Sequence, residues 1–221
     1  RRPFSPYAQI SQVPLPTVQR ALDEVFRRWG CPGALRVDNG RPLGEPGSDL
    51  IPVMALWLIG KGIDVLWNRA RQPTDNAKVE RMQSVTACWA EPGACATHEV
   101  LAAHLEQAAY LQRSRYRVRS LKGRTRDVAY PNLLAGGRRY DAEGFDLDRV
   151  LDFLAQGTWV RKVSKVGQID FYGQRWQVGA SYRRQRVWLR LDRETRQWLV
   201  SAEDGSSHVI EACGEALDGG V

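Results

Sequence analysis

Two carboxylates in this sequence stand where a metal-dependent reaction could use them, and the first is Asp38. It follows a short apolar segment, residues 34–37, and precedes Asn39 and Gly40, which turn the chain sharply. An acid at the end of a buried strand points out of the carboxyl edge of a sheet, where ligands bind in layered α/β domains. The alternative is an ordinary tight turn, since Asp-Asn-Gly is also a common turn sequence.

The second carboxylate is Glu80, which lies where a polar loop leads into a helix that we expect over residues 76–90. Helical spacing predicts a buried apolar stripe on this helix made of Val79, Met82, Val85 and Trp89. Glu80 is one position round from that stripe, at its edge with solvent. The alternative interpretation is a solvent-facing glutamate that the helix dipole stabilises.

An aspartate at a strand edge and a glutamate on a later helix can converge on one divalent cation. Carboxylate oxygens suit Mg²⁺ or Mn²⁺. Two such ions about 4 Å apart can activate a water or a 3′-hydroxyl and stabilise the leaving oxygen of a phosphodiester. This chemistry needs no histidine, and we interpret the three histidines of the chain as structural or solvated: His98, His104 and His208.

The positive charge of the chain is concentrated in two segments. Its 221 residues carry 32 Lys and Arg against 25 Asp and Glu, which gives a formal net charge of +7 and a pI near 9.5. Residues 112–126 hold seven bases and no acid, and residues 159–200 hold ten bases and three acids. Arginine-rich, aromatic-interleaved segments favour a polyphosphate partner, and the alternative is a solvated basic face. No apolar run approaches the ~20 residues of a membrane-spanning helix, so we expect no membrane partner.

The expected elements follow the order of an α/β layered domain and then a small β-rich one. In the first part we expect strands at 6–13, 34–37 and 63–67, and helices at 17–29, 48–61, 76–90 and 97–111. The 63–67 strand does not alternate, which is typical of a strand covered on both faces. An extended basic connector, 116–144, leads to a short helix at 145–156. Five short β segments follow with glycine corners, typical of a closed barrel: 159–165, 168–171, 175–178, 186–192 and 197–201.

The residues around the two carboxylates resemble the catalytic core of the retroviral-integrase and DDE-transposase superfamily, of the bacterial insertion-sequence type. The resemblance lies, in order and spacing, in Val37-Asp38-Asn39-Gly40, Gly62-Ile63-Asp64-Val65 and Pro73-x-x-Asn76-x-Lys78-Val79-Glu80-Arg81. The glycine- and tryptophan-bearing stretch from Trp159 to Val187 resembles the β-barrel that follows the core in Mu-type bacterial transposases. The resemblance covers roughly residues 5–115 and 158–201.

This resemblance implies an RNase H-like core with an Asp-Asp-Glu triad that binds Mg²⁺ or Mn²⁺ and cuts and joins DNA. Asp38 would be the second aspartate and Glu80 the glutamate, both catalytic and metal-binding. Asn39 and Asn76 would border the site, and Lys78 and Arg81 would lie near the DNA backbone. The implied partners are mobile-element ends, target DNA and further copies of the chain, and the implied location is the cytoplasm of a bacterium, at the nucleoid.

The sequence departs from the family at the first aspartate, which in the family lies on the first strand of the sheet. Only 37 residues precede Asp38, and residues 6–13 match the third strand. We therefore expect a core without its first two strands and one metal ligand. Such a chain should bind divalent metal weakly and lack strand-transfer activity by itself. Its exposed sheet edge should pair with another copy or be covered by another segment.

The expected domains are a partial core (1–115), a basic connector with a short helix (116–157), a small SH3-like DNA-binding barrel (158–204) and a tail (205–221). In the connector region the expected phosphate contacts are Arg113, Arg115, Arg117, Arg119, Lys122, Arg124 and Arg126. In the barrel they are Arg175, Arg183, Arg184, Arg186 and Arg190, with Trp176, Tyr182 and Trp188 packing or stacking.

Two other functions compete with the transposase interpretation. The first is a non-catalytic basic DNA-binding module, in which Asp38 marks a turn and Glu80 is solvated. The second is a protein-interaction domain built on the aromatic barrel. It ranks last because it has no account of the paired carboxylates.

Overall fold

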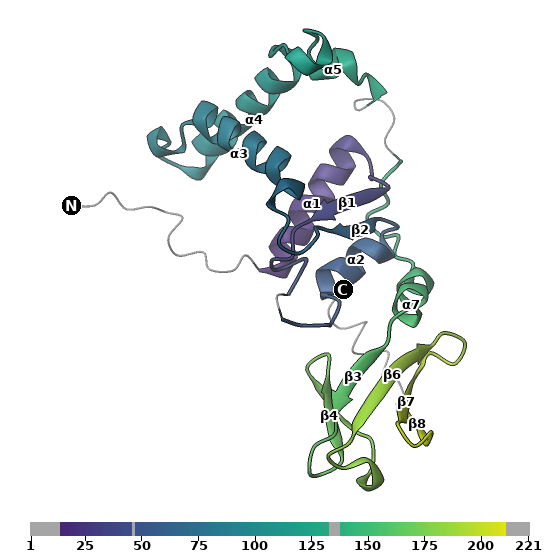
Figure 1. The fold of residues 1–221 in the computed structure, drawn as a ribbon. Helices are drawn as coiled ribbons and strands as arrows, with labels where there is room; N and C mark the ends of the chain where they lie inside the picture. Colours follow the sequence, from purple (N-terminus) through teal and green to yellow (C-terminus); the bar gives the residue numbers. More distant parts are fainter. Residues whose placement is uncertain (1–13, 46, 133–137, 211–221) are drawn as a thin grey trace, which may run out of the picture. The chain divides into compact units, whose positions relative to one another are not determined.

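The computed structural model describes residues 14–45, 47–132 and 138–210 of a mixed α/β chain (Figure 1). These residues form two compact units. The first contains the described residues up to 20, then 33–67 and those from 143 onward; the second contains 21–32 and those of 68–142. The strand expected at residues 6–13 lies outside the described residues. No helix in the described ranges is long and apolar enough to cross a membrane.

The α/β part of the first unit is a strand, a helix and a second strand parallel to the first. β1 (Ala34–Val37) pairs with β2 (Asp64–Trp67), with Ala34 opposite Asp64 and Val37 opposite Trp67. α2 (Val53–Gly60) provides the crossover that parallel neighbours require. Both strands and the helix between them are thereby confirmed.

The helix α2 starts later than expected. The sequence of this helix is apolar, and every residue from Met54 to Gly60 is buried. The expected start at residue 48 is wrong, because Pro52 disfavours helical backbone in the residue before it. Pro52 takes the N-cap position, and the Ser48 hydroxyl instead accepts a hydrogen bond from Leu50 N at 3.1 Å. Gly62, with φ 75°, turns the chain from α2 into β2.

The strand β2 is covered on one face, not on two. Val65 is buried, whereas Asp64 and Leu66 are exposed, Leu66 to 47%. The expectation of a strand buried on both faces is therefore wrong for the described residues, in which this sheet has two strands.

The helix α7 (Leu147–Ala155) packs against α2 through Val150, Leu151 and Leu154. Asp146 caps it by accepting from Arg149 N at 3.1 Å. The Asp146 N–H donates to the carbonyl of Gly60 at 2.9 Å. Gly60 has to be glycine, because a Cβ there would overlap the ring of Phe145.

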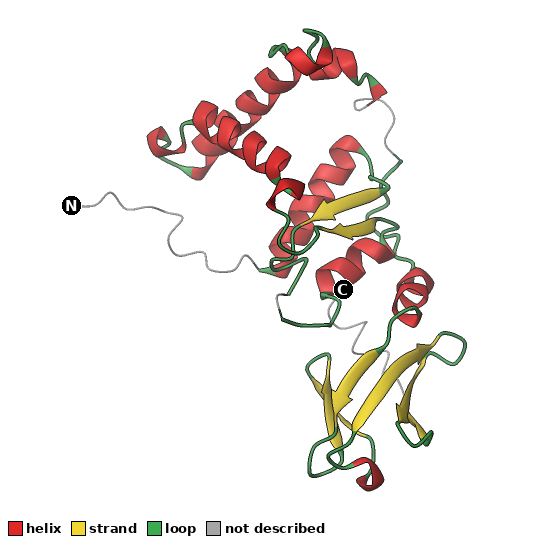
Figure 2. Cartoon of the chain, in the orientation of Figure 1, coloured by secondary structure: helices red, strands yellow, loops and turns green. Residues whose placement is uncertain are grey.

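Six strands in two sheets complete the first unit (Figure 2). The four-stranded antiparallel sheet has the order β3-β6-β7-β8 and the second sheet pairs β4 with β5. The bounds are β3 (Trp159–Lys162), β4 (Gln168–Phe171), β5 (Gln174–Gln177), β6 (Arg186–Asp192), β7 (Gln197–Ala202) and β8 (Ser207–Ile210). The five expected strands are confirmed, and β8 lies in residues that we expected to be tail.

The core between these strands is aliphatic and aromatic. Its aliphatic side chains include Val163, Ile169, Val187, Leu189 and Val200, all 2% exposed or less. Trp198 meets the rings of Trp159 and Phe171 edge-on, with centroids 5.4 and 4.8 Å away. Edge-to-face geometry of this kind adds to the burial of apolar area. The interior of this part is thus well specified by side-chain shape.

The loop that precedes α2 is tied to β3 by two side chains. The indole N–H of Trp159 donates to the carbonyl of Asp49 at 3.0 Å. The Arg161 guanidinium donates to both carboxylate oxygens of Asp49, at 2.8 and 2.9 Å, and lies over the ring of Phe171. This bidentate geometry is the stronger kind of ion pair.

Asp49→Asn is expected to lower the urea midpoint of unfolding at pH 7 and to have a shrinking effect below about pH 4. The hydrogen bonds from Arg161 lower the pKa of Asp49. A carboxylate whose pKa is lower in the folded state stabilises the fold at pH values above its unfolded-state pKa, about 3.9. This contribution is lost as the pH falls through the folded-state pKa. Urea unfolding of both proteins at pH 7, 4, 3 and 2.5 measures the difference. An effect of equal size at every pH would contradict the charge-based explanation.

The second unit is built on a helical hairpin. α3 (Ala77–Ala90) and α4 (His98–Ser114) pack together, and Thr97 caps α4 by accepting from Val100 N. The Gln112 amide donates to the hydroxyl of Thr86 at 2.8 Å, which links the two helices. The short helices η2 (Pro73–Asp75) and η3 (Pro92–Ala94) precede and follow α3.

The end of α1 (Leu15–Trp29) is attached to α4 in the same unit. Arg28 makes a bidentate ion pair with Glu106, at 2.7 and 3.0 Å. The guanidinium groups of Arg28 and Arg113 make cation–π contacts with the ring of Trp29, each 4.8 Å from its centroid. α1 begins two residues before the expected start at residue 17, because Pro16 is tolerated in the first turn of a helix.

The apolar stripe of α3 is exposed rather than buried. Val79, Met82 and Trp89 are 45%, 54% and 37% exposed, and Ala90 is the buried residue of this helix. The expectation of a buried stripe is therefore wrong for the described residues. Helical spacing predicts that such residues share one face, but it does not say whether another element covers that face.

The first part of the connector, residues 116–129, is compact where we expected it to be extended. Val118 pairs with Arg124, and η4 (Arg119–Leu121) forms the turn between them. Lys122 and Gly123 adopt positive φ, which closes this turn. α5 (Arg126–Ala129) follows directly. The turn holds its basic side chains on a defined backbone.

Candidate carboxylate and nucleic-acid-binding sites

Asp38 directly follows β1 in the first unit and is exposed to solvent. One of its carboxylate oxygens, Oδ1, accepts a hydrogen bond from Gly40 N at 3.0 Å. This contact is the side-chain turn that an Asp-Asn-Gly sequence favours. Asp38 thus shapes the turn with one oxygen, and Asn39 is exposed in the same turn.

Glu80 lies in the first turn of α3, in the second unit. Its backbone N–H donates to the carbonyl of Asn76 at 3.0 Å, and its side chain is exposed. Asn76 precedes the helix without a capping hydrogen bond from its side chain. An acid in the first turn is stabilised by the helix dipole whatever its further role.

Each of the two carboxylates has the chemistry of a ligand for a hard divalent cation. Both are exposed, and within the described part of the chain neither forms an ion pair with a basic side chain. Carboxylate oxygens in this state suit Mg²⁺ and Mn²⁺. Among the described residues, no group of three or more His, Cys, Asp or Glu gathers in a way that could hold a metal ion. Each carboxylate by itself thus has the donor type for such an ion, while the described residues show no assembled metal-binding cluster.

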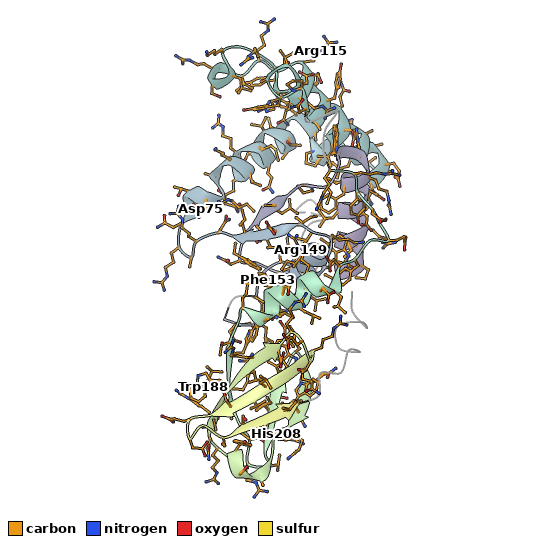
Figure 3. All side chains as sticks on the ribbon, turned by 90° about the vertical axis from the view of Figure 1, so that its right-hand side faces the viewer. Asp75, Arg115, Arg149, Phe153, Trp188 and His208 are labelled. Carbon is orange, nitrogen blue, oxygen red and sulfur yellow. The ribbon has the colours of Figure 1, made fainter. Side chains whose placement is uncertain are left out.

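The seven bases expected in residues 112–126 divide into five exposed side chains and two half-buried ones. Figure 3 marks Arg115, the first of the exposed group. The exposed group is Arg115, Arg117, Arg119, Lys122 and Arg124. Arg113 lies over Trp29, and Arg126 donates to the carbonyl of Gln112 at 2.6 Å. These last two contribute to packing as well as to charge.

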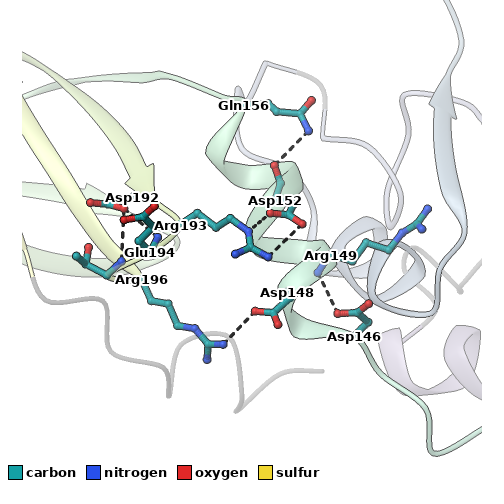
Figure 4. Close-up of polar contacts among 10 residues, drawn as sticks. Asp146, Asp148, Arg149, Asp152, Gln156, Asp192, Arg193, Glu194 and Arg196 are labelled. Carbon is teal, nitrogen blue, oxygen red and sulfur yellow. Dashed lines mark hydrogen bonds and ion pairs between the residues drawn. The ribbon is translucent and has the colours of Figure 1, made fainter.

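Four of the ten bases in residues 159–200 are paired with acids. Arg161 binds Asp49, and Arg175 lies 3.6 Å from Asp170. Arg193 and Arg196, in the turn between β6 and β7, bind Asp152 and Asp148 of α7 (Figure 4). The ion pairs of Arg193 and Arg196 offset the positive charge of that turn, so these two arginines are less available to a polyanion. Arg175 is therefore the weakest of the barrel residues expected to contact DNA.

The bases without acid partners gather along β6 and its neighbour β3. Alternation places Arg186, Trp188 and Arg190 on the outer face of β6, while Val187, Leu189 and Leu191 are buried. Lys162 of β3 lies directly opposite Arg186. We call Lys162, Arg186, Trp188 and Arg190 the basic face; Figure 3 marks Trp188 on it. Arg183 and Arg184, both exposed, lie just before β6, separated from it by Gln185.

The like charges on the basic face cost stability. Two cations directly opposite each other on antiparallel strands repel, and no acid within ion-pair distance among the described residues relieves Lys162 and Arg186. A polyanion bound to this face would relieve that repulsion. Lys162 was absent from the expected set, and only the register of β3 against β6 identifies it.

The three expected barrel aromatic residues have different environments. Tyr182 is 8% exposed and belongs to the core. Trp176 is half-buried and donates its indole N–H to the carbonyl of Phe171. Trp188 is also half-buried but lies on the outer face, opposite Val160. Trp188 is therefore the aromatic residue that can contact a ligand of the basic face.

A comparison with models of known protein families finds no match to this sequence. The resemblance to the integrase and transposase core therefore rests on its motifs and on the order of the elements that carry them.

Proposed function

We propose that this chain is a DNA transposition or integration protein of the DDE type, with Asp38 and Glu80 as its metal-binding carboxylates. The proposal includes an RNase H-like core, an SH3-like barrel and association with further copies. The observation that carries it is the order of elements around the acids. Asp38 directly follows β1, α2 leads to a parallel strand β2, and Glu80 lies in the first turn of the next helix, α3.

The chemistry assigned to each residue follows from its type and place. Asp38 and Glu80 would hold Mg²⁺ or Mn²⁺, which when bound supplies activation of a water or a 3′-hydroxyl. Lys78 and Arg81, exposed on the helix of Glu80, would hold backbone phosphates of the DNA. Asn39 and Asn76 would border the reacting strand.

The basic face supports a nucleic-acid partner. Phosphate contacts made by Lys and Arg supply most of the affinity of a protein for DNA. A half-buried tryptophan between two such arginines can pack on sugar or base. Arg186 lies two residues before Trp188 and Arg190 two residues after it, on the same outer face of β6, which supports this role.

Asp38→Asn combined with Glu80→Gln is expected to abolish Mn²⁺ binding to the chain. Each single substitution should weaken binding at least about tenfold, as loss of a carboxylate near a metal does. Calorimetric titration of the whole chain with Mn²⁺ measures both effects. Circular dichroism checks that the variants fold. We expect them to fold, because both substituted side chains are exposed.

The matched control is Asp170→Asn combined with Glu203→Gln, two exposed acids of the strand-rich part. This variant changes the net charge equally and should leave Mn²⁺ binding unchanged. Equal binding by the wild-type chain and the Asp38/Glu80 variant would overturn the catalytic proposal.

The second candidate function is a DNA-binding module without catalysis. The hydrogen bond from Gly40 N to Asp38 favours it, because it gives that acid a structural role. In this case the basic face carries the function by itself. Two results together would identify a DNA-binding module: the Asp38/Glu80 variant still binds DNA, and its affinity for Mn²⁺ equals that of the wild-type chain.

A further inference from the structure

A pocket of about 360 Å³ lies in the second unit, lined by α3, the end of α4, Tyr116 and α5. Its volume falls in the range of about 300–1,000 Å³ typical of sites for small ligands. Its wall has a cationic part and an apolar part.

The cationic part consists of Lys78, Arg81 and Arg126. None of the residues lining the pocket is acidic, and none of the three bases forms an ion pair within the described residues. The Arg126 guanidinium is held in place by its hydrogen bond to the Gln112 carbonyl, at 2.6 Å. Three cations around one pocket repel each other and favour an anionic ligand.

The apolar part presents aromatic and aliphatic surface to the same pocket. Met82, Val85, Trp89 and Tyr116 line it. The rings of Trp89 and Tyr116 meet edge-on, with centroids 5.6 Å apart, and are 37% and 52% exposed. Flat, accessible rings next to cations are the surface that a heteroaromatic base with a phosphate matches.

The pocket is on the opposite side of α3 from Glu80. Successive helical residues are about 100° apart, so Lys78, Met82, Val85 and Trp89 fall on one face. Glu80 lies about 200° round from Lys78 on the same basis. The pocket is therefore separate from the carboxylate site, and binding there requires neither Glu80 nor a metal.

We propose that this pocket binds a single nucleotide, with its phosphate on Lys78, Arg81 and Arg126 and its base against Trp89 and Tyr116. The nucleotide has two possible sources, a free nucleoside monophosphate or an unpaired nucleotide of a DNA strand. Both offer the same phosphate and base. The inference goes beyond the proposed function, because it adds a site for a base on the face of α3 away from Glu80. It also gives the phosphate contacts of Lys78 and Arg81 to the nucleotide bound there.

The test is a calorimetric titration of the whole chain with dAMP in EDTA, so that no metal site contributes. Trp89→Leu should weaken dAMP binding about 10- to 100-fold, since stacking supplies much of the affinity for a base. The combined variant Lys78→Gln/Arg81→Gln should weaken it by a similar factor. Both bases are exposed, so this variant tests the pocket even if Trp89→Leu fails to fold.

Tyr116→Leu and Tyr110→Leu form a matched pair of exposed tyrosines in the same unit, of which only Tyr116 lines the pocket. The first should weaken binding and the second should not. Titration with inorganic phosphate should show much weaker binding that does not depend on Trp89.

A second arm separates the two sources. A DNA duplex with one unpaired nucleotide is compared with the same duplex carrying an abasic residue there, in wild type and in Tyr116→Leu. Tyr116-dependent preference for the unpaired nucleotide, without binding of free dAMP, supports the pocket and identifies the strand as the source. The proposal is overturned if neither dAMP nor the unpaired nucleotide shows binding that depends on Trp89 or Tyr116. Because all arms are run in EDTA, this result is independent of the Mn²⁺ titration that tests Asp38 and Glu80.

Discussion

Leu58→Ala is expected to lower the free energy of unfolding of the first unit by about 3–5 kcal/mol. Leu58 is 0% exposed in the middle of α2, a helix whose residues from Met54 to Gly60 are all buried. Removing its side chain loses the transfer free energy of the methyl groups and leaves a cavity. Packed residues on every side of α2 limit how far the structure can relax into that cavity. Urea unfolding followed by far-ultraviolet circular dichroism measures the change.

The matched control for this prediction is Leu199→Ala on β7. Leu199 is 39% exposed, so the same chemical change should cost less than about 1 kcal/mol. Equal losses for the two variants would contradict the burial of α2. They would also contradict the parallel pairing of β1 with β2, because α2 forms the crossover between those strands.

Arg186→Gln combined with Arg190→Gln is expected to weaken DNA binding about 10- to 100-fold at low salt. It should also reduce the slope of log affinity against log salt by roughly 1.8, since each lost phosphate contact removes about 0.9. The physical reason is that both side chains lie on the outer face of β6 without an acid partner among the described residues. Fluorescence anisotropy of a labelled duplex at several salt concentrations measures both quantities.

The control variant is Arg193→Gln combined with Arg196→Gln, which removes the same charge from the next turn. These arginines bind Asp152 and Asp148, so their loss should leave the slope nearly unchanged. The ion pairs are about half exposed, so their removal should change the stability of the chain little. Equal changes in slope for the two double variants would show that net charge, rather than the basic face, determines binding. A flat salt dependence in the wild-type chain would contradict DNA binding altogether.

Strands and helices with strong periodic patterns were predictable from the sequence. β1, β4 and β6 have the expected bounds, because short apolar or alternating segments between turn residues specify strands locally. Thr97 marks the start of α4 as a capping residue should. β8 was missed because Ser207 and His208 carry little strand preference, and pairing with β7 provides the stabilisation.

The sites were less predictable than the elements. The sequence identifies Arg186 and Arg193 equally well as bases, yet only tertiary structure brings Asp152 to Arg193 and leaves Arg186 beside Lys162. The pocket was not expected at all. Lys78 and Trp89 share one face of α3, and Arg126 joins them only because α4 packs on α3 and α5 packs on α4. The signal available beforehand was the spacing of Met82, Val85 and Trp89 along one helical face, which we interpreted as core, with Lys78 one turn before Met82.

The distribution of ion pairs along the β6–β7 hairpin gives this part of the chain an electric dipole moment. The beginning of β6 keeps the charge of Arg183, Arg184 and Arg186, whereas α7 neutralises Arg193 and Arg196 at the far end. A rod-shaped polyanion approaching through solution experiences a torque in such a field before any contact forms. The hairpin would therefore select one direction of approach, and raising the ionic strength would remove that selection along with the affinity.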